Sequence, residues 1–150
     1  MNRRTFLCGL TLGTVTTSLS AVAQQAGRVY RVGFIFLTSP VSEMAGPEPV
    51  HHLARTFVQA LRALGYVEGQ NLILERRSGE GQNERLGGIV AELVHLKADV
   101  IVTGGDPVPR AAKAMTTTVP IVMTSSTDPV GDGLVQSLAR PGGNITGLTT

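Results

Sequence analysis

Cysteine, aromatic side chains and excess charge are all scarce in this sequence. It has no tryptophan, and aromatic residues make up 4% of its 150 residues. Proteins that stack nucleic-acid bases or enclose cations in aromatic cages depend on such side chains, so the scarcity argues against both classes. Hydrophobic residues make up 42% and charged residues 16%, which is typical of a folded domain rather than a disordered chain. The length suits one domain with a buried core.

The one cysteine, Cys8, falls within a predicted export signal. Residues 1–23 begin with a basic region that contains Arg3 and Arg4, continue with a short apolar and hydroxylic stretch, and end in a small-residue cleavage site at Ala23. The stretch is too short and too interrupted by glycine and threonine to predict a membrane-spanning helix. The paired arginines resemble a twin-arginine signal, although general secretory signals also begin this way. We therefore expect cleavage near Ala23 and a mature chain without disulfides or a reactive thiol.

Removal of the predicted signal leaves a chain with no formal net charge. The full sequence has 13 Lys and Arg against 11 Asp and Glu, and the signal accounts for Arg3 and Arg4, so 11 residues of each sign remain. The basic character of the full sequence is therefore no indication of nucleic-acid binding. We expect no nucleic-acid partner, since no excess of basic residues is left to contact phosphates.

Apolar runs and amphipathic stretches alternate along residues 24–150. Short apolar runs predict buried strands, and apolar residues spaced three and four apart predict helices. The predicted strands cover residues 31–37, 71–77, 99–105, 119–124 and 144–150, and the predicted helices cover residues 51–65, 83–98, 106–117 and 133–139. The second strand has thinner apolar content, which suits a sheet edge. This alternation predicts an α/β fold with a parallel sheet of about five strands and helices on both faces.

Small hydroxylic and glycine-rich segments follow three of the predicted strands. In parallel sheets, ligands bind outside the carboxyl ends of the strands, near the point where the strand order reverses. Hydroxyls and unpaired N–H groups at the following helices could bind a carboxylate, and a nearby acid could bind an ammonium group. The candidate ligand-binding residues are Thr38, Ser39, Gly104, Gly105, Asp106, Ser125, Ser126, Thr127 and Asp128. The same residue types also cap helices and form tight turns, so capping stays open for each segment.

The sequence lacks the common motifs of catalysis and cofactor binding. It has no G-x-x-x-x-G-K-[ST] phosphate loop, no dinucleotide fingerprint after the first strand and no G-x-S-x-G nucleophile motif. His51, His52 and His95 lack metal-binding spacing, and we interpret them as solvated or capping residues. We therefore expect no catalytic residue, cofactor or metal. The alternative is an exported α/β enzyme that uses Asp106 and Asp128 as general acid and base.

Three segments resemble one known family. The segments LRALGYVEGQNLILERRSGEG, ERLGGIVAELVHLKADVIVTGG and AAKAMTTTVPIVMTSSTDPVGDGLVQSLARPGGNITGLT are similar to bacterial ABC-transporter substrate-binding proteins of the periplasmic-binding type I fold. The resemblance is continuous over residues 65–147. Its most specific parts are DPVGDGLVQSLARPGGNITG and the turn G-Y-x-E-G-x-N.

The resemblance implies two α/β lobes of flavodoxin-like topology joined by a hinge. Members of the family clamp a small solute between the lobes and deliver it to a membrane permease powered by a separate ATPase. They are roughly twice as long as this sequence, so residues 24–150 would form the N-terminal lobe, truncated near the crossing to a second lobe that the sequence lacks. The resemblance also implies a ligand crevice at the ends of the first, third and fourth strands.

Ligand identity varies within the family, and for this chain we expect a small amino-acid-like solute. The expected location is the periplasm. A non-functional truncated copy is a further alternative, because a lone lobe would leave the surface that faces its partner lobe exposed.

Overall fold

The computed structural model describes residues 27–150, so the predicted export signal of residues 1–23 lies outside the described residues. Strands and helices alternate along this part of the chain. The elements are β1 (Tyr30–Phe36), α2 (Val41–Met44), α3 (His52–Ala63), β2 (Leu72–Ser78), α4 (Glu84–His95), β3 (Val100–Gly104), α5 (Pro107–Met115), β4 (Ile121–Met123) and β5 (Ile145–Gly147).

The strands form one parallel sheet in the order β2-β1-β3-β4-β5. The prediction of a five-stranded parallel sheet is confirmed, and so is the edge position predicted for the strand at residues 71–77. From β1 the chain first adds β2 on one side and then β3 on the other. The strand order therefore reverses between β1 and β3, which is where ligands bind in sheets of this order.

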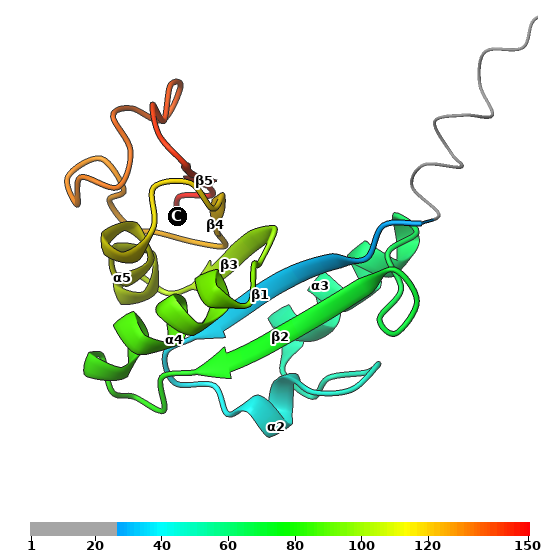
Figure 1. Ribbon diagram of the computed structural model, residues 1–150. Helices are drawn as coiled ribbons and strands as arrows, with labels where there is room; N and C mark the ends of the chain where they lie inside the picture. The colour runs from blue at the N-terminus through cyan, green and yellow to red at the C-terminus, as the bar shows by residue number, and fades with distance from the viewer. Residues whose placement is uncertain (1–26) are drawn as a thin grey trace, which may run out of the picture.

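Helices cover both faces of the sheet, as predicted (Figure 1). On one face, α2 and α3 pack on an aromatic cluster in which Phe57 of α3 stacks on Phe34 with ring centroids 4.9 Å apart. On the other face, α4 and α5 pack on aliphatic side chains such as Ile35 and Ile101, which are fully buried. Adjacent residues of β1 thus point into two different cores, and burial of each such side chain stabilises the fold by about 1.5–3 kcal/mol.

One predicted helix does not form. Residues 133–139 are turns and bends, so the prediction of a helix there was wrong. The Asp128 carboxylate accepts a hydrogen bond from the N–H of Gly131 at 2.8 Å, and the Pro129 carbonyl accepts the N–H groups of the two residues after Gly133. Gly133 has φ +66°, which helical residues do not adopt. Helices this short form few internal hydrogen bonds, and local turns satisfy the backbone instead.

The structure adds one helix that the sequence analysis did not predict, α2. Its four residues include a single buried side chain, Met44, so they show no periodic pattern. The Glu43 carbonyl of α2 accepts a hydrogen bond from the N–H of His51 at 2.9 Å, which fixes where α3 begins. The remaining strands and helices lie within a few residues of their predicted ranges.

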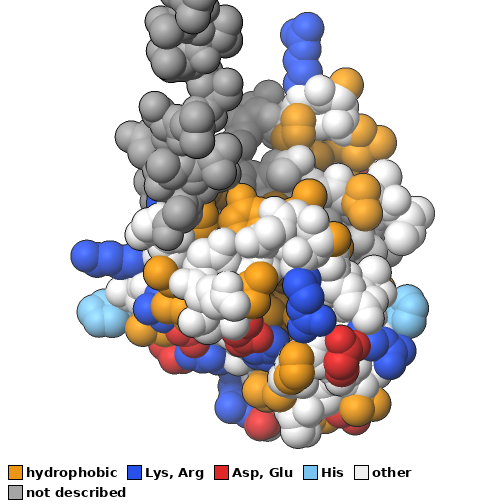
Figure 2. All heavy atoms as spheres, turned by 90° about the vertical axis from the view of Figure 1, so that its right-hand side faces the viewer, with side chains coloured by type: hydrophobic (Ala, Val, Ile, Leu, Met, Phe, Trp, Pro, Cys, Tyr) orange, Lys and Arg blue, Asp and Glu red, His pale blue; other side chains and the backbone are white. Residues whose placement is uncertain are grey.

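Charges of both signs are interspersed on the face that Figure 2 shows. Ion pairs among the described residues include that of Arg77 of β2 with Glu92 of α4, at 2.7 Å. The described helices include none with the length and apolar character needed to span a bilayer.

Candidate functional site

The carboxyl ends of β1, β3 and β4 lie side by side at one edge of the sheet. Phe36, the last residue of β1, pairs with Gly104, the last of β3, and Thr103 pairs with Met123, the last of β4. Neighbouring strands in a sheet are about 4.8 Å apart. The three predicted ligand-binding segments therefore start next to one another, at the point where the strand order reverses.

A side-chain contact joins the segments after β3 and β4. Asp106 accepts hydrogen bonds from the N–H of Thr127 at 3.1 Å and from its hydroxyl at 3.0 Å. Asp106 precedes α5, yet its side chain makes no capping hydrogen bond to that helix. The capping interpretation is therefore wrong for Asp106, whose carboxylate holds the β4 segment against the β3 segment.

The pKa of Asp106 lies below its usual value. The largest cause is the backbone N–H of Thr127, followed by the Thr127 hydroxyl, because donors stabilise the charged carboxylate. Arg110 adds a smaller effect from a distance, and its guanidinium is paired with Asp132. Within residues 27–150 no cation forms an ion pair with Asp106. The carboxylate is ionised at neutral pH, and its remaining lone pairs could accept hydrogen bonds from an ammonium group.

Ser126 lies beneath this contact and is 1% exposed. Its hydroxyl is close enough to Asp106 to help lower the pKa of that carboxyl, but it has no partner in hydrogen-bond geometry among the described residues. A buried polar group without a partner costs about 1–3 kcal/mol. Ser125, its neighbour, is partly exposed, so the two serines of this segment differ in their access to solvent.

The segment after β1 is held by His51. The Nε2 atom of His51 lies 3.1 Å from the Ser39 hydroxyl, and its Nδ1 atom accepts a hydrogen bond from the N–H of Ala54 at 3.2 Å. The capping interpretation is thus confirmed for His51, which caps α3. Thr38 is exposed beside it. Sequence reasoning did not connect His51 to Ser39, because the two are 12 residues apart and no local pattern links them.

The last residue of β3, Gly104, and the residue that follows it, Gly105, both need to be glycine. A Cβ atom on Gly104 would overlap the Phe36 ring, and Gly105 has φ +85°, the left-handed region that glycine adopts most easily. The first turn of α5 contains Pro107 and Pro109, which have no N–H group. This turn therefore offers fewer free donors to an anion than the sequence analysis assumed.

Asp128 is engaged within its own turn. Its carboxylate accepts the N–H of Gly131 at 2.8 Å, so the turn interpretation holds for this residue. Asp106 and Asp128 are thus held by different partners, Asp106 across the sheet edge and Asp128 locally. Residues 27–150 contain no group of three or more His, Cys, Asp or Glu side chains placed to hold a metal ion.

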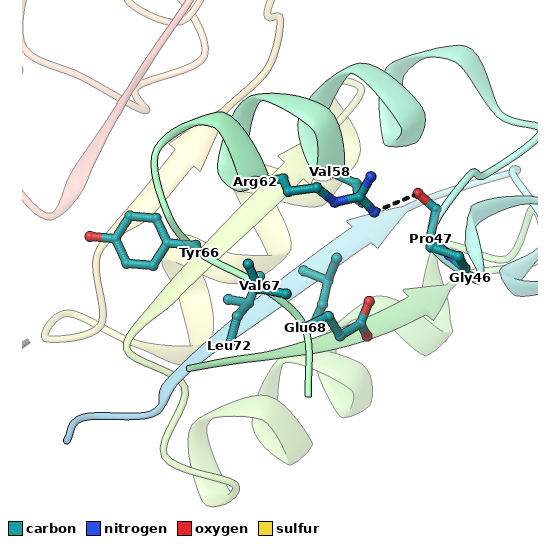
Figure 3. A pocket seen from close by; sticks show the side chains of 9 residues that line it. Gly46, Pro47, Val58, Arg62, Tyr66, Val67, Glu68 and Leu72 are labelled. Atoms are coloured by element: carbon teal, nitrogen blue, oxygen red, sulfur yellow. Dashed lines mark hydrogen bonds between the residues drawn. The ribbon is translucent and has the colours of Figure 1, made fainter. Parts of the chain in front are cut away.

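A cavity of about 420 Å³ lies between α3 and the start of β2 (Figure 3). It is separate from the carboxyl ends of β1, β3 and β4, where the candidate residues lie. Val58, Tyr66 and Leu72 provide apolar walls, and Arg62 donates a hydrogen bond to the Pro47 carbonyl at 3.0 Å across its rim. The candidate residues at the strand ends do not line it. A second cavity, of about 320 Å³, lies between the segment after β4 and the residues after β5.

Comparisons with known proteins give one consistent result. The family model described as "ABC transporter substrate binding protein" matches residues 47–150. A tyrosine-binding protein from Clostridioides difficile (strain R20291) is 33% identical over 109 residues, which cover 73% of this chain and 32% of the relative. The ligand-free, open structure of a substrate-binding protein with adhesive properties from Clostridium difficile has a TM-score of 0.70 at 27% identity, over 79% of this chain and 38% of that one.

The fold recurs at lower sequence identity. The ABC domain from Streptococcus pneumonia, solved in complex with L-Trp, has a TM-score of 0.69 at 24% identity, over 81% of this chain and 38% of that one. The chain spans about a third of the length of its curated relative, and its sheet matches one lobe of the periplasmic-binding type I fold. The family model covers more than half of the chain. This chain therefore belongs to the family of ABC transporter substrate-binding proteins.

Proposed function

We propose that this protein is the extracytoplasmic substrate-binding component of an ABC transporter. It binds a small polar solute at the carboxyl ends of β1, β3 and β4 and delivers it to a membrane permease. The observation that carries the proposal is Asp106, an ionised carboxylate held by Thr127 without an ion-pair partner among the described residues. A fixed negative charge with free lone pairs, beside several hydroxyls, suits a solute that has both a cationic and an anionic group.

The solute class we propose is an amino acid. Asp106 would accept hydrogen bonds from the α-ammonium group, and the partly exposed hydroxyls of Ser39 and Ser125 would donate to the α-carboxylate. Membership of a substrate-binding family supports the general role, and the similarity to a tyrosine-binding protein supports the solute class. Backbone groups and shape would come from the other residues predicted at the strand ends, which are Thr38, Gly104, Gly105, Ser126 and Thr127.

We also propose that residues 24–150 form one lobe and that the solute is clamped against a second one. The relative's greater length supports a second lobe in the complete protein. One lobe supplies only part of the solute's contacts, so affinity of the 150-residue chain should lie in the millimolar range, where ΔG of binding is about −4 kcal/mol. Closure of a second lobe would raise the affinity.

The periplasmic location follows from the proposed signal at residues 1–23. Expression of the 150-residue chain in a Gram-negative host, followed by mass spectrometry of the periplasmic fraction, tests it. We expect a mature form that begins at Gln24. An uncleaved chain confined to the cytoplasm would contradict the proposal.

Calorimetric titration tests the proposed function itself. The 150-residue chain would be titrated with L-tyrosine, with the other common amino acids, and with neutral sugars of similar size as a contrast. We expect weak binding of at least one amino acid and none of the sugars. Replacement of Asp106 by Asn should weaken that binding, and replacement of Asp128 by Asn, the matched control in the neighbouring turn, should not. Absence of amino-acid binding at saturating concentrations would overturn the proposal.

A further inference from the structure

We propose that His51 fixes the hydrogen-bonding direction of Ser39: it donates to the Ser39 oxygen and so leaves the hydroxyl hydrogen free to be donated to a solute. The inference rests on the proposed function, because it concerns the same edge of the sheet. It assigns His51 a positioning role in solute selection, in addition to its role as the cap of α3.

The first step is the tautomer of His51. Its Nδ1 atom accepts the N–H of Ala54 at 3.2 Å, and a nitrogen that accepts a hydrogen bond carries no proton. The neutral ring must then carry its proton on Nε2. Capping of α3 therefore selects one of the two neutral tautomers.

The second step is the direction of the bond to Ser39. Because Nε2 carries the proton, it donates to the Ser39 hydroxyl oxygen, which lies 3.1 Å away. The serine hydrogen then cannot point at His51. Ser39 is partly exposed, and among residues 27–150 its hydroxyl hydrogen has no other acceptor. The hydrogen is left for solvent or for a solute at the end of β1.

The third step is the rigidity of the imidazole ring. The ring edge packs against Phe36, the last residue of β1, with centroids 4.9 Å apart. The backbone N–H of His51 is bound to the Glu43 carbonyl of α2 at 2.9 Å. A ring flip or a change of tautomer would break the cap or the Ser39 contact. The Ser39 hydrogen is therefore available to a solute acceptor such as a carboxylate, whereas one of the two acceptor sites of the hydroxyl is already occupied by His51.

The tautomer is tested without any solute. The 150-residue chain labelled with ¹⁵N-histidine would be studied by long-range proton–nitrogen NMR at neutral pH, with the His51 signals assigned by comparison with His51→Asn. We expect a protonated, pyrrole-type Nε2 and an unprotonated Nδ1. The opposite tautomer, or rapid exchange between the two, would overturn the inference.

The effect on solute choice is tested with three related compounds. L-tyrosine, its analogue without the amine, 3-(4-hydroxyphenyl)propanoate, and its analogue without the carboxylate, tyramine, would each be titrated by NMR into the wild type, Ser39→Ala, His51→Asn and the double variant. Asparagine is a good N-cap, so His51→Asn keeps the cap of α3 but is too short to reach Ser39. His52→Asn, at the exposed neighbouring position, is the matched control.

We expect Ser39→Ala to weaken tyrosine and the propanoate about tenfold, as for one hydrogen bond to a charged group, and to leave tyramine unchanged. His51→Asn should weaken the same two compounds roughly threefold, because the hydroxyl must then be ordered on binding. The double variant should match Ser39→Ala alone, since His51 acts through the hydroxyl. Additive losses, or equal losses for tyramine, would show a general structural effect and overturn the inference. If the wild type binds none of the three and no other amino acid while Nε2 is protonated, the solute-binding proposal fails and the tautomer assignment stands.

Discussion

Each end of β3 is flanked by an aspartate, and the two aspartates are used differently. Asp99 precedes the strand and lies at the amino edge of the sheet, whereas Asp106 follows it and lies at the carboxyl edge. Both carboxyls have a pKa below the usual value, and for both the largest cause is a backbone N–H that donates to the carboxylate. The difference between them lies in the other partners of each carboxylate.

Asp99 is fully engaged in structure. One of its oxygens accepts the N–H of Arg31 at 2.8 Å, and the other accepts a hydrogen bond from the Arg28 guanidinium at 2.7 Å. It thereby ties the start of β1 to the start of β3 and has a cation beside it. Among residues 27–150, Asp106 has only the two hydrogen-bond donors of Thr127. A charge that is held in place but not neutralised is available to a ligand, which supports the proposal that the solute binds at the carboxyl edge.

The largest expected effect concerns packing at the carboxyl end of β3. Gly104→Ala should destabilise the chain by about 3 kcal/mol, because a methyl group there overlaps the Phe36 ring and the core must deform. Urea denaturation measures the change. Gly88→Ala is the matched control, since Gly88 lies in α4 with open space around it and should gain about 1 kcal/mol. If Gly88→Ala lowered the free energy of unfolding as much as Gly104→Ala, overlap with the Phe36 ring would not explain the effect.

Asp99→Asn comes next. Loss of the charge weakens the hydrogen bonds that Asp99 accepts from the Arg31 backbone N–H and from the Arg28 guanidinium. The free energy of unfolding should therefore fall by about 2 kcal/mol. Amino-acid affinity should not change, because this aspartate lies at the opposite edge. Arg28→Ala should have a much smaller effect on stability, since the Arg28 side chain is 62% exposed and such pairs contribute little. If Asp99→Asn bound the amino acid more weakly than the wild type, the amino edge would also affect binding, and the proposed difference between the two edges would be wrong.

Asp106→Asn should show the reverse pattern. Affinity for an amino acid should fall about tenfold, or ~1.4 kcal/mol, while the free energy of unfolding changes by less than that amount. Titration calorimetry and urea denaturation of the same preparation measure both quantities. Unchanged affinity together with a large loss of stability would make Asp106 a structural residue like Asp99.

Acid should weaken the fold at both edges. A carboxyl whose pKa is lowered by folding contributes stability above its unfolded value, near 3.9 for Asp, and loses that contribution as the pH falls through the folded value. We therefore expect the unfolding free energy to be insensitive to these two groups between pH 5 and pH 7, and to fall below about pH 4. Urea denaturation from pH 7 to pH 2.5 checks this, and Asp99→Asn should show a shallower decline than the wild type.

Sequence reasoning predicted the sheet because strand burial is a local signal. Residues 32–37 are apolar throughout, and β1 is buried on both faces. The same reasoning predicted a helix at residues 133–139, where apolar residues have helical spacing but Gly133 and the Asp128 turn direct the backbone elsewhere. The spacing of apolar residues gives no information about local hydrogen bonds that compete with helix formation.

The sequence predicted where the candidate residues lie, at the strand ends, but not which side chains they contact. Strand ends can be found from a sequence, since the last apolar residue of each run marks them. The partners of Asp106 and Ser39 cannot, because Thr127 and His51 are 21 and 12 residues away and meet them only through the fold. Gly33 is a further example. It lies within β1, and a Cβ there would come within 2.7 Å of the Leu93 side chain of α4, a constraint that no sequence pattern indicates.

The central claim, that the carboxyl edge of the sheet binds an amino acid, is tested most directly by amide NMR. The ¹⁵N-labelled 150-residue chain would be titrated with L-tyrosine and the shifted amides assigned. We expect shifts at Ser39, at Gly105 and Asp106, and from Ser125 to Thr127, with none at Asp99 or around the cavity of Figure 3. Shifts confined to that cavity or to the amino edge, or no shifts at saturating tyrosine and none with any other amino acid, would contradict it.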